Sequence, residues 1–219
     1  AAQVLKAGGQ AMRSGELIAA MAENARDHEN TLLVDTMVAG TSTTCYDGAS
    51  FFSATHTARG SSGVQSNIVT GDGTTQTNLE TNLEEAITAQ RRFLDEGGRA
   101  WRRNWDPSQR VIFAPPELEW KFRKILNLGT ISTGGANVYQ GAGQLVLVPE
   151  LSDTGDWYVG YMGGVLKPFI FQVRVPTEFE AQEKGSDSAF ENAEYHYGTY
   201  ARHAVGFGFW QDMIKVDQA

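Results

Sequence analysis

Small apolar residues recur at spacings of three and four along the first forty residues, the spacing of one face of an α-helix. The pattern is strongest between Glu16 and Ala39, so we expect a long helix over this range. Gly40 follows directly and is the predicted stop. Because its buried stripe would consist of small side chains, this helix is suited to lie close against a sheet.

From Thr41 to Thr77 the periodic pattern gives way to Thr, Ser, Gly, Asn and Asp. The exceptions are an apolar pair at Phe51-Phe52 and a weak strand pattern at Val64–Val69. The Asp47-Gly48 and Asp72-Gly73 pairs predict turns, since neither has the run of alternating oxygen ligands that a calcium loop needs. This range is therefore interpreted as a loop-rich excursion from one body, and not as a linker between independent domains.

Regular patterns return at Asn78 and include both helices and strands. An amphipathic helix is predicted from Asn78, its expected N-cap, to a stop at Gly97-Gly98. A buried strand at Val111–Ala114 comes next, and a helix that begins at Pro115-Pro116 follows it. Leu145–Val148 has the composition of another buried strand.

The C-terminal part of the chain reads as strands. Trp157–Met162 and Phe169–Val175 are predicted strands, and residues from Tyr195 to Trp210 alternate cleanly between two faces. The alternation sends His196 to the face opposite its neighbouring tyrosines. The last run is much longer than the usual strand of about five or six residues, so we expect one long twisted strand or two with a bend at the glycines. Helices and strands that do not strictly interleave indicate an α+β fold.

Composition narrows the class of protein. The 219 residues are 41% hydrophobic and 20% charged, which is typical of one globular domain or two small subdomains. No apolar run approaches the roughly 18 residues of a membrane span, and we expect no membrane partner. A formal net charge of -8 argues against a surface built wholly to coat nucleic acid. The chain begins at Ala1 without an initiator Met, so we expect it to be the remainder of a longer polypeptide.

Candidate catalytic chemistry is sparse. The single cysteine, Cys45, excludes an internal disulfide and a CxxC zinc framework, and four histidines leave little material for a metal site. Cys45 and His56 could form a nucleophile and base, but no catalytic signature surrounds either residue. The glycines of Gly141–Gln144 precede a strand, whereas a dinucleotide fingerprint follows one. We therefore predict no enzyme and no catalytic, cofactor or metal residues, and keep a small cysteine hydrolase as an alternative.

Two clusters of opposite charge stand out. The basic cluster interleaves arginines with tryptophans and comprises Arg91, Arg92, Arg99, Trp101, Arg102, Arg103 and Trp105. The acidic cluster precedes the last strand and comprises Glu178, Glu180, Glu183, Asp187, Glu191 and Glu194. Arg and Trp are frequent anchors of protein interfaces, and patches of opposite charge attract copies of one chain.

We therefore predict subunit contacts that join members of the two clusters, namely Arg99, Trp101, Arg102, Arg103 and Trp105 with Glu178, Glu180 and Glu183. Two alternatives remain for the basic cluster. Arginines interleaved with aromatic rings also bind nucleic acid, by gripping phosphates and stacking on bases. The second alternative is that the basic cluster is an ordinary solvated surface without a binding partner.

Five segments, in order along the chain, resemble motifs of one known family. They are Tyr46-Asp47-Gly48-Ala49-Ser50-Phe51-Phe52-Ser53-Ala54-Thr55-His56, Asn78-Leu79-Glu80 with its helix to Phe93, Val111-Ile112-Phe113-Ala114-Pro115-Pro116-Glu117-Leu118-Glu119, Leu166-Lys167-Pro168-Phe169-Ile170-Phe171-Gln172, and Tyr197-Gly198 with Ala201-Arg202 through Gly206-Phe207-Gly208-Phe209-Trp210. Over most of its length the chain thus resembles the Mu-like phage major head proteins.

The resemblance implies the Hong Kong 97-type phage capsid fold. In that fold a long spine helix braces a peripheral (P) domain, and an axial (A) domain follows. The implied ranges are 1–77 for the spine helix, P-domain segment and loop-rich excursion, 78–165 for the A-domain, and 166–219 for the return to the P-domain and the long C-terminal strand. The N-terminal arm and E-loop of this fold precede the spine helix, so we expect them to be absent from this chain.

The resemblance also implies the function of a major capsid protein. Such a protein assembles with copies of itself, as hexamers and pentamers, into the icosahedral head of a tailed bacteriophage. The head encloses double-stranded DNA without sequence-specific binding, forms in the bacterial cytoplasm and ends in the virion. Portal, decoration or scaffold proteins are further expected partners. Alternatives are an encapsulin-like protein nanocompartment, or a monomeric binding module that exposes Trp101, Trp105 and Trp157.

Overall fold

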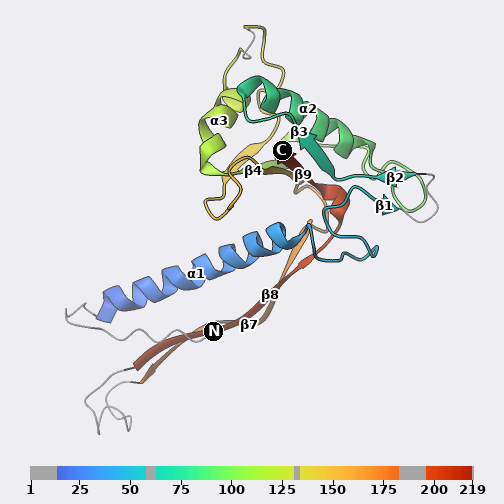
Figure 1. Ribbon diagram of the computed structural model, residues 1–219. Coiled ribbons are helices and arrows are strands. Elements are labelled where there is room, and N and C mark those ends of the chain that lie inside the picture. The colour runs from blue at the N-terminus through green and yellow to red at the C-terminus, as the bar shows by residue number, and fades with distance from the viewer. Residues whose placement is uncertain (1–13, 58–62, 131–133, 183–195, 219) are drawn as a thin grey trace. The chain divides into compact units, whose positions relative to one another are not determined.

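The chain divides into two compact units in the computed structural model, which describes residues 14–57, 63–130, 134–182 and 196–218 (Figure 1). Unit 1 draws on the ranges Ala1–Asp35 and Phe171–Gly206, and unit 2 on Thr36–Ile170 and Phe207–Ala219. Each unit therefore joins segments that are far apart in the sequence. The assignment of ranges 1–77, 78–165 and 166–219 to capsid subdomains stays a prediction.

A five-stranded mixed sheet forms the centre of unit 2, in the order β3-β9-β6-β4-β5. Its strands are β3 (Ile68–Gly71), β4 (Arg110–Ala114), β5 (Gln144–Leu147), β6 (Trp157–Tyr161) and β9 (Met213–Gln218). β6 is antiparallel to β4 and β9, whereas the pairs β3–β9 and β4–β5 are parallel. The C-terminal strand β9 thus lies inside the sheet and joins β3 to the other strands.

Two helices cover this sheet, α2 (Gln76–Arg92) and α3 (Glu119–Asn127), and they lie over the same side of it (Figure 1). Each was predicted from its apolar periodicity. Leu79 and Leu83 of α2 are fully buried. The ring of Phe122 in α3 meets Trp157 of β6 edge to face, with ring centres 4.8 Å apart. The short 3₁₀ turn η2 (Pro116–Leu118) leads into α3, which explains the tolerated proline pair.

The predicted ends of α2 were wrong. The N-cap is Thr75, whose hydroxyl accepts a hydrogen bond from the backbone N–H of Asn78 at 3.3 Å. The Asn78 side chain instead donates to the carbonyl of Asp72 at 2.6 Å. The helix ends at Arg92, before the glycine pair, because Phe93 takes an extended backbone and buries its ring.

The strand pattern at Val64–Val69 is split into two strands. β1 (His56–Thr57) pairs antiparallel with β2 (Val64–Gln65), and β3 begins only at Ile68. Asn67 interrupts the run because its side chain is drawn into buried hydrogen bonds.

The long C-terminal pattern is also divided. β8 (His196–Phe207) ends before Gly208, and the 3₁₀ turn η3 (Trp210–Asp212) leads into β9. The N–H of Gly208 donates to the carbonyl of Pro168 at 2.7 Å, and a Cβ at this position would overlap the carbonyl oxygen of Lys167. Within the predicted range the structure therefore has one long strand of 12 residues, the first of the two expected arrangements, which stops at the glycines instead of continuing to Trp210. The strand β9, which follows the turn, was not predicted.

Unit 1 holds most of α1 (Ser14–Ala39) and of the two-stranded sheet formed by β7 (Phe169–Gln182) and β8. The predicted long helix is confirmed. One face of α1, which includes Met21 and His28, lines a cavity of about 370 Å³ together with strand residues that include Thr177, Thr199 and His203. His203 is almost fully buried there, and its Nδ1 lies 3.5 Å from the carboxylate of Glu29.

Gly40 ends α1 as predicted, but for a different reason. The positive φ angles of the described chain fall at other glycines, so Gly40 is not a left-handed cap. A Cβ at Gly40 would lie 2.8 Å from the Phe52 ring, and the Gly40 carbonyl accepts the Phe52 N–H at 2.9 Å. The glycine is required because the Phe52 ring packs directly on the backbone.

We expect Gly40→Ala to lower the free energy of unfolding by about 1–3 kcal/mol, because the added methyl group displaces the Phe52 ring. Urea unfolding followed by circular dichroism measures this difference. Gly129→Ala is the matched control, since a Cβ there meets no atom within 4 Å. Its effect should stay within about 0.5 kcal/mol. Equal losses for the two variants would show that close packing on Phe52 is not the reason for the glycine.

Candidate functional site

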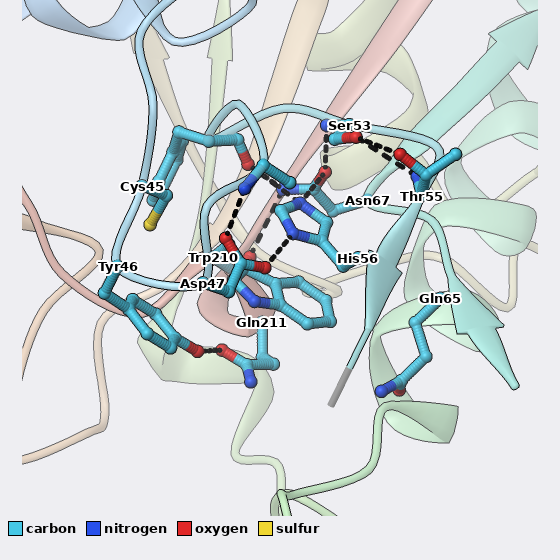
Figure 2. Close-up of polar contacts among 12 residues, drawn as sticks. Cys45, Tyr46, Asp47, Ser53, Thr55, His56, Gln65, Asn67, Trp210 and Gln211 are labelled. Carbon is cyan, nitrogen blue, oxygen red and sulfur yellow. Dashed lines mark hydrogen bonds and ion pairs between the residues drawn. The ribbon is translucent and has the colours of Figure 1, made fainter. Parts of the chain in front are cut away.

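The segment from Asp47 to His56 folds around a fully buried histidine (Figure 2). The Nδ1 atom of His56 lies 2.6 Å from Oδ2 of Asp47. Its Nε2 atom lies 3.2 Å from the carbonyl oxygen of Phe51 and 3.1 Å from Oδ1 of Asn67. The imidazole also stacks on the indole of Trp210, with ring centres 4.0 Å apart and planes within 4°. We call Asp47, His56, Asn67 and Trp210 the histidine cluster.

A tight turn presents Asp47 to the histidine. Gly48 has a φ of 87°, which glycine adopts without strain, and its N–H donates to the carbonyl of Cys45 at 3.1 Å. Oδ1 of Asp47 accepts the N–H of Ala49 at 3.1 Å, the arrangement of an Asx turn. The predicted turn at Asp47-Gly48 is confirmed, and it leaves Oδ2 of Asp47 for His56.

Asn67 ties the histidine cluster to the C-terminal segment. Its amide nitrogen donates to the carbonyl of Phe51 at 2.7 Å, of Met213 at 3.3 Å and of Trp210 at 3.5 Å. Its amide oxygen accepts the N–H of Ser53 at 2.8 Å. The side chain of Asn67 thus connects three parts of the chain: the loop after α1, the start of β3, and η3. The sequence alone offered no signal for this role.

Cys45 and His56 do not form the nucleophile and base of a hydrolase. The thiol is buried, points away from His56 and donates weakly to the carbonyl of Gly208 at 3.8 Å (Figure 2). Both ring nitrogens of His56 are directed to Asp47, Phe51 and Asn67. Burial raises the pKa of the Cys45 thiol, the opposite of what an activated nucleophile requires.

The centre of the basic cluster is an internal ion pair. Asp212 is fully buried, and Arg102 donates to it through Nε at 2.8 Å and through a terminal nitrogen at 2.6 Å. The indole N–H of Trp101 donates to the same carboxylate at 2.9 Å. The hydrogen bond to Asp212 raises the pKa of the Arg102 guanidinium. The arginine also lies over the rings of Trp101 and Tyr161, at 5.6 and 5.3 Å from their centres.

The tryptophans proposed for a monomeric binding module are mostly internal, so that expectation was wrong. Trp157 is fully buried in β6, and Trp105 is buried against Tyr161 with ring centres 4.7 Å apart. Trp101 is half-buried and meets Phe209 edge to face.

The basic cluster has fewer surface members than the sequence indicated. Arg99 is exposed and forms an ion pair with Asp95, and Arg103 is exposed as well. Glu178 and Glu180 are exposed on β7, whereas the other acidic members, Glu183, Asp187, Glu191 and Glu194, lie outside the described residues. The predicted contact between subunits stays a prediction, but Arg102, Trp101 and Trp105 already have internal partners.

Asp212 and Gln90 are further site residues that sequence reasoning missed. The Gln90 side chain on α2 donates to the carbonyl of Asp212 at 3.2 Å. The available signal was two polar residues, Gln211 and Asp212, inside an otherwise apolar run. Among the described residues, no helix combines the length and apolar character of a membrane span, and no three His, Cys, Asp or Glu side chains are grouped as metal ligands.

We expect Arg102→Met to lower the free energy of unfolding by about 3 kcal/mol, because it leaves the buried Asp212 carboxylate without its cation. Chemical denaturation measures the loss. The adjacent Arg103→Met removes an exposed charge and is the control, with an expected change within about 0.5 kcal/mol. Equal stability of the two variants would show that the ion pair does not anchor Asp212. Because Arg102 was predicted to lie in a contact between subunits, its substitution cannot test that contact, since the change would also destabilise the fold.

We expect the Cys45 thiol to react with a soluble disulfide reagent at least about tenfold more slowly in the folded chain than in urea at a pH near 8.5. The reason is that the raised pKa lowers the thiolate fraction at this pH, and burial blocks the reagent. Spectrophotometric labelling measures the two rates. A folded chain that reacts as fast as the unfolded one would indicate an accessible thiolate and reopen the hydrolase interpretation.

Solved structures with the same fold are phage capsid chains. The chain matches a chain in the capsid structure of the cyanophage P-SCSP1u, with a TM-score of 0.59 and 11% identity, over 100% of this chain and 71% of that one. It matches the mature capsid of bacteriophage PhiM1 with a TM-score of 0.56 and 10% identity, over 100% and 70%. The fold is therefore of the Hong Kong 97 type, as the sequence resemblance implied.

The chain is shorter than some relatives. It spans 45% of a chain in the procapsid of bacteriophage JBD30, which matches 94% of this chain with 19% identity and a TM-score of 0.47. No curated protein sequence matches the chain.

A match to a protein-family model assigns the chain to a family. The model of the Mu-like prophage major head subunit gpT matches residues 14–81 and 152–219, together more than half of the chain. Both matched ranges contribute to the histidine cluster, with Asp47, His56 and Asn67 in the first and Trp210 in the second. The chain belongs to the family of the Mu-like prophage major head subunit gpT.

Proposed function

We propose that this chain is a shell-building subunit that associates with copies of itself to form a phage head. The observation that carries the proposal is its membership of the major head subunit family, together with the capsid fold. Proteins of this kind are structural, and their chemistry lies in contacts between copies. The finer features that we propose are an icosahedral lattice of hexamers and pentamers and a cargo of double-stranded DNA held without sequence-specific binding.

The exposed apolar side chains of unit 1 support self-association. Phe171, Val173, Phe179 and Tyr200 on β7 and β8 are each 39–54% exposed. A sheet of two strands is only marginally stable alone, and clustered apolar exposure is typical of an interaction surface. Contact with neighbouring copies would bury these side chains and add partners to the free strand edges.

Opposite charges support contacts of a second kind. Arg99 and Arg103 on unit 2 and Glu178 and Glu180 on unit 1 are exposed and opposite in sign. Each such contact between copies contributes little, but a closed lattice repeats it many times, so modest interfaces give a stable shell.

The proposal also covers where the shell assembles and which other proteins it contacts. The shell would assemble in the bacterial cytoplasm and persist as the capsid of the virion. Portal, decoration or scaffold proteins would join it there as other components of the head.

We expect the purified chain to form rings or shells, and Arg99→Glu combined with Arg103→Glu to reduce their yield at least about fivefold at low salt. Negative-stain electron microscopy and light scattering measure the yield. Circular dichroism should show that the double variant stays folded, since both side chains are exposed. A parent chain that remains monomeric at high concentration would contradict the proposed function.

The control variant is Lys124→Glu, which reverses an exposed charge outside the basic cluster. Normal particles from the Arg99 and Arg103 double variant would discard the charged interface but not the shell. Restored yield when Glu178→Arg and Glu180→Arg are added would support pairing between the clusters. Nucleic acid recovered from particles supports a phage head, whereas a protein cargo indicates an encapsulin-like compartment.

A further inference from the structure

With Asp47 as a carboxylate, each ring nitrogen of His56 faces only oxygen atoms that accept hydrogen bonds. Nδ1 faces the carboxylate of Asp47 at 2.6 Å. Nε2 faces the backbone carbonyl of Phe51 at 3.2 Å and the amide oxygen of Asn67 at 3.1 Å. A neutral imidazole carries one N–H and one lone pair, so it would turn a lone pair toward one of these oxygens.

The orientation of the Asn67 amide is fixed by its other partners, although oxygen and nitrogen are assigned from such contacts. Its nitrogen lies near three carbonyl oxygens, those of Phe51, Trp210 and Met213, and its oxygen receives the N–H of Ser53. A flipped amide would place its oxygen against three acceptors and its nitrogen against a donor. The atom that faces Nε2 is therefore an acceptor.

We propose that His56 carries a proton on both ring nitrogens, as an imidazolium paired with Asp47, and that this charged pair is a pH-sensitive latch on the C-terminal segment. The fully buried ring donates from one side to the loop that starts at Asp47. From the other side it donates to Asn67 and Phe51. Its face covers Trp210, so the proton sits where the loop, the start of β3 and η3 meet.

The surroundings favour a cation at this position. Asp47 is the titratable group in direct contact with the ring among the described residues, and its carboxylate balances the charge. The π face of Trp210 lies parallel to the ring and attracts a cation. The other carboxylate of η3, Asp212, is already paired with Arg102. On the loop, the Cys45 thiol turns to Gly208, and the Tyr46 hydroxyl turns to Gln211.

The direction of the pH effect follows from proton counting. In an opened segment the histidine is water-exposed and loses its second proton above a pH of about 6.5, the ordinary range of histidine. Opening at higher pH therefore releases one proton and becomes more favourable as pH rises. While the closed latch keeps its proton, the equilibrium constant for opening increases about tenfold per pH unit.

The first test is a measurement on the unaltered chain with ¹⁵N-labelled histidine rings. We expect both ring nitrogens of one histidine to show the shifts and directly bonded protons of imidazolium at neutral pH. His56→Gln assigns this signal by its loss. A neutral ring with one unprotonated nitrogen at neutral pH would overturn the proposal, whatever the variants do.

The second test is hydrogen–deuterium exchange of residues 208–213 between about pH 7 and 9, corrected for the intrinsic exchange rate. We expect the opening constant of the unaltered chain to rise about tenfold per pH unit. His56→Gln should remove this extra slope, and Asp47→Asn should reduce it, because the amide no longer balances a cation. The control His28→Gln changes an exposed histidine on α1 and should keep the slope. Equal slopes in the unaltered chain and His56→Gln would refute the latch.

Discussion

The burial of a polar C-terminal segment is the constraint on which the rest of unit 2 depends. Trp210, Gln211 and Asp212 of η3 are all buried, and buried polar groups are costly unless each finds a hydrogen-bond partner. The partners come from distant parts of the chain: Asn67 binds the carbonyls, Tyr46 binds Gln211, and Arg102 binds Asp212. Because β9 follows directly and joins β3 to β6, the central sheet is complete only when these side chains are in place.

Elements with a strong local period could be predicted from the sequence, whereas their ends and long-range partners could not. α1, α2, β4 and β6 follow from apolar spacing, since each buries one stripe or a continuous run. The ends of α2 were set by Thr75 and Phe93, whose effects depend on a single hydrogen bond and on one buried ring. The bend after β8 arises at Gly208 from a close approach to Lys167 that is invisible in a local pattern.

Long-range partners were even harder to predict in the candidate site. Arg102 and Arg103 are neighbours of equal charge, and no local pattern separates them. Arg102 is committed to a buried carboxylate 110 positions away, whereas Arg103 remains exposed. Likewise, the motif from Asp47 to His56 supported the family resemblance but not its physical role. That role depends on Asn67 and Trp210, which lie outside the motif and reach it only in the folded chain.

The two units meet the requirements of burial to different degrees, and this difference bears on assembly. In unit 2, two helices cover a five-stranded sheet whose central strand β6 is buried at every residue. In unit 1, nearly all of β7 is exposed, including large apolar side chains. Burial of apolar surface is the main favourable contribution to folding, so unit 1 retains surface that contacts with other copies would remove from water. Under the proposed function, contacts between copies would therefore supply part of the stability of unit 1, whereas the core of unit 2 is already formed within one chain.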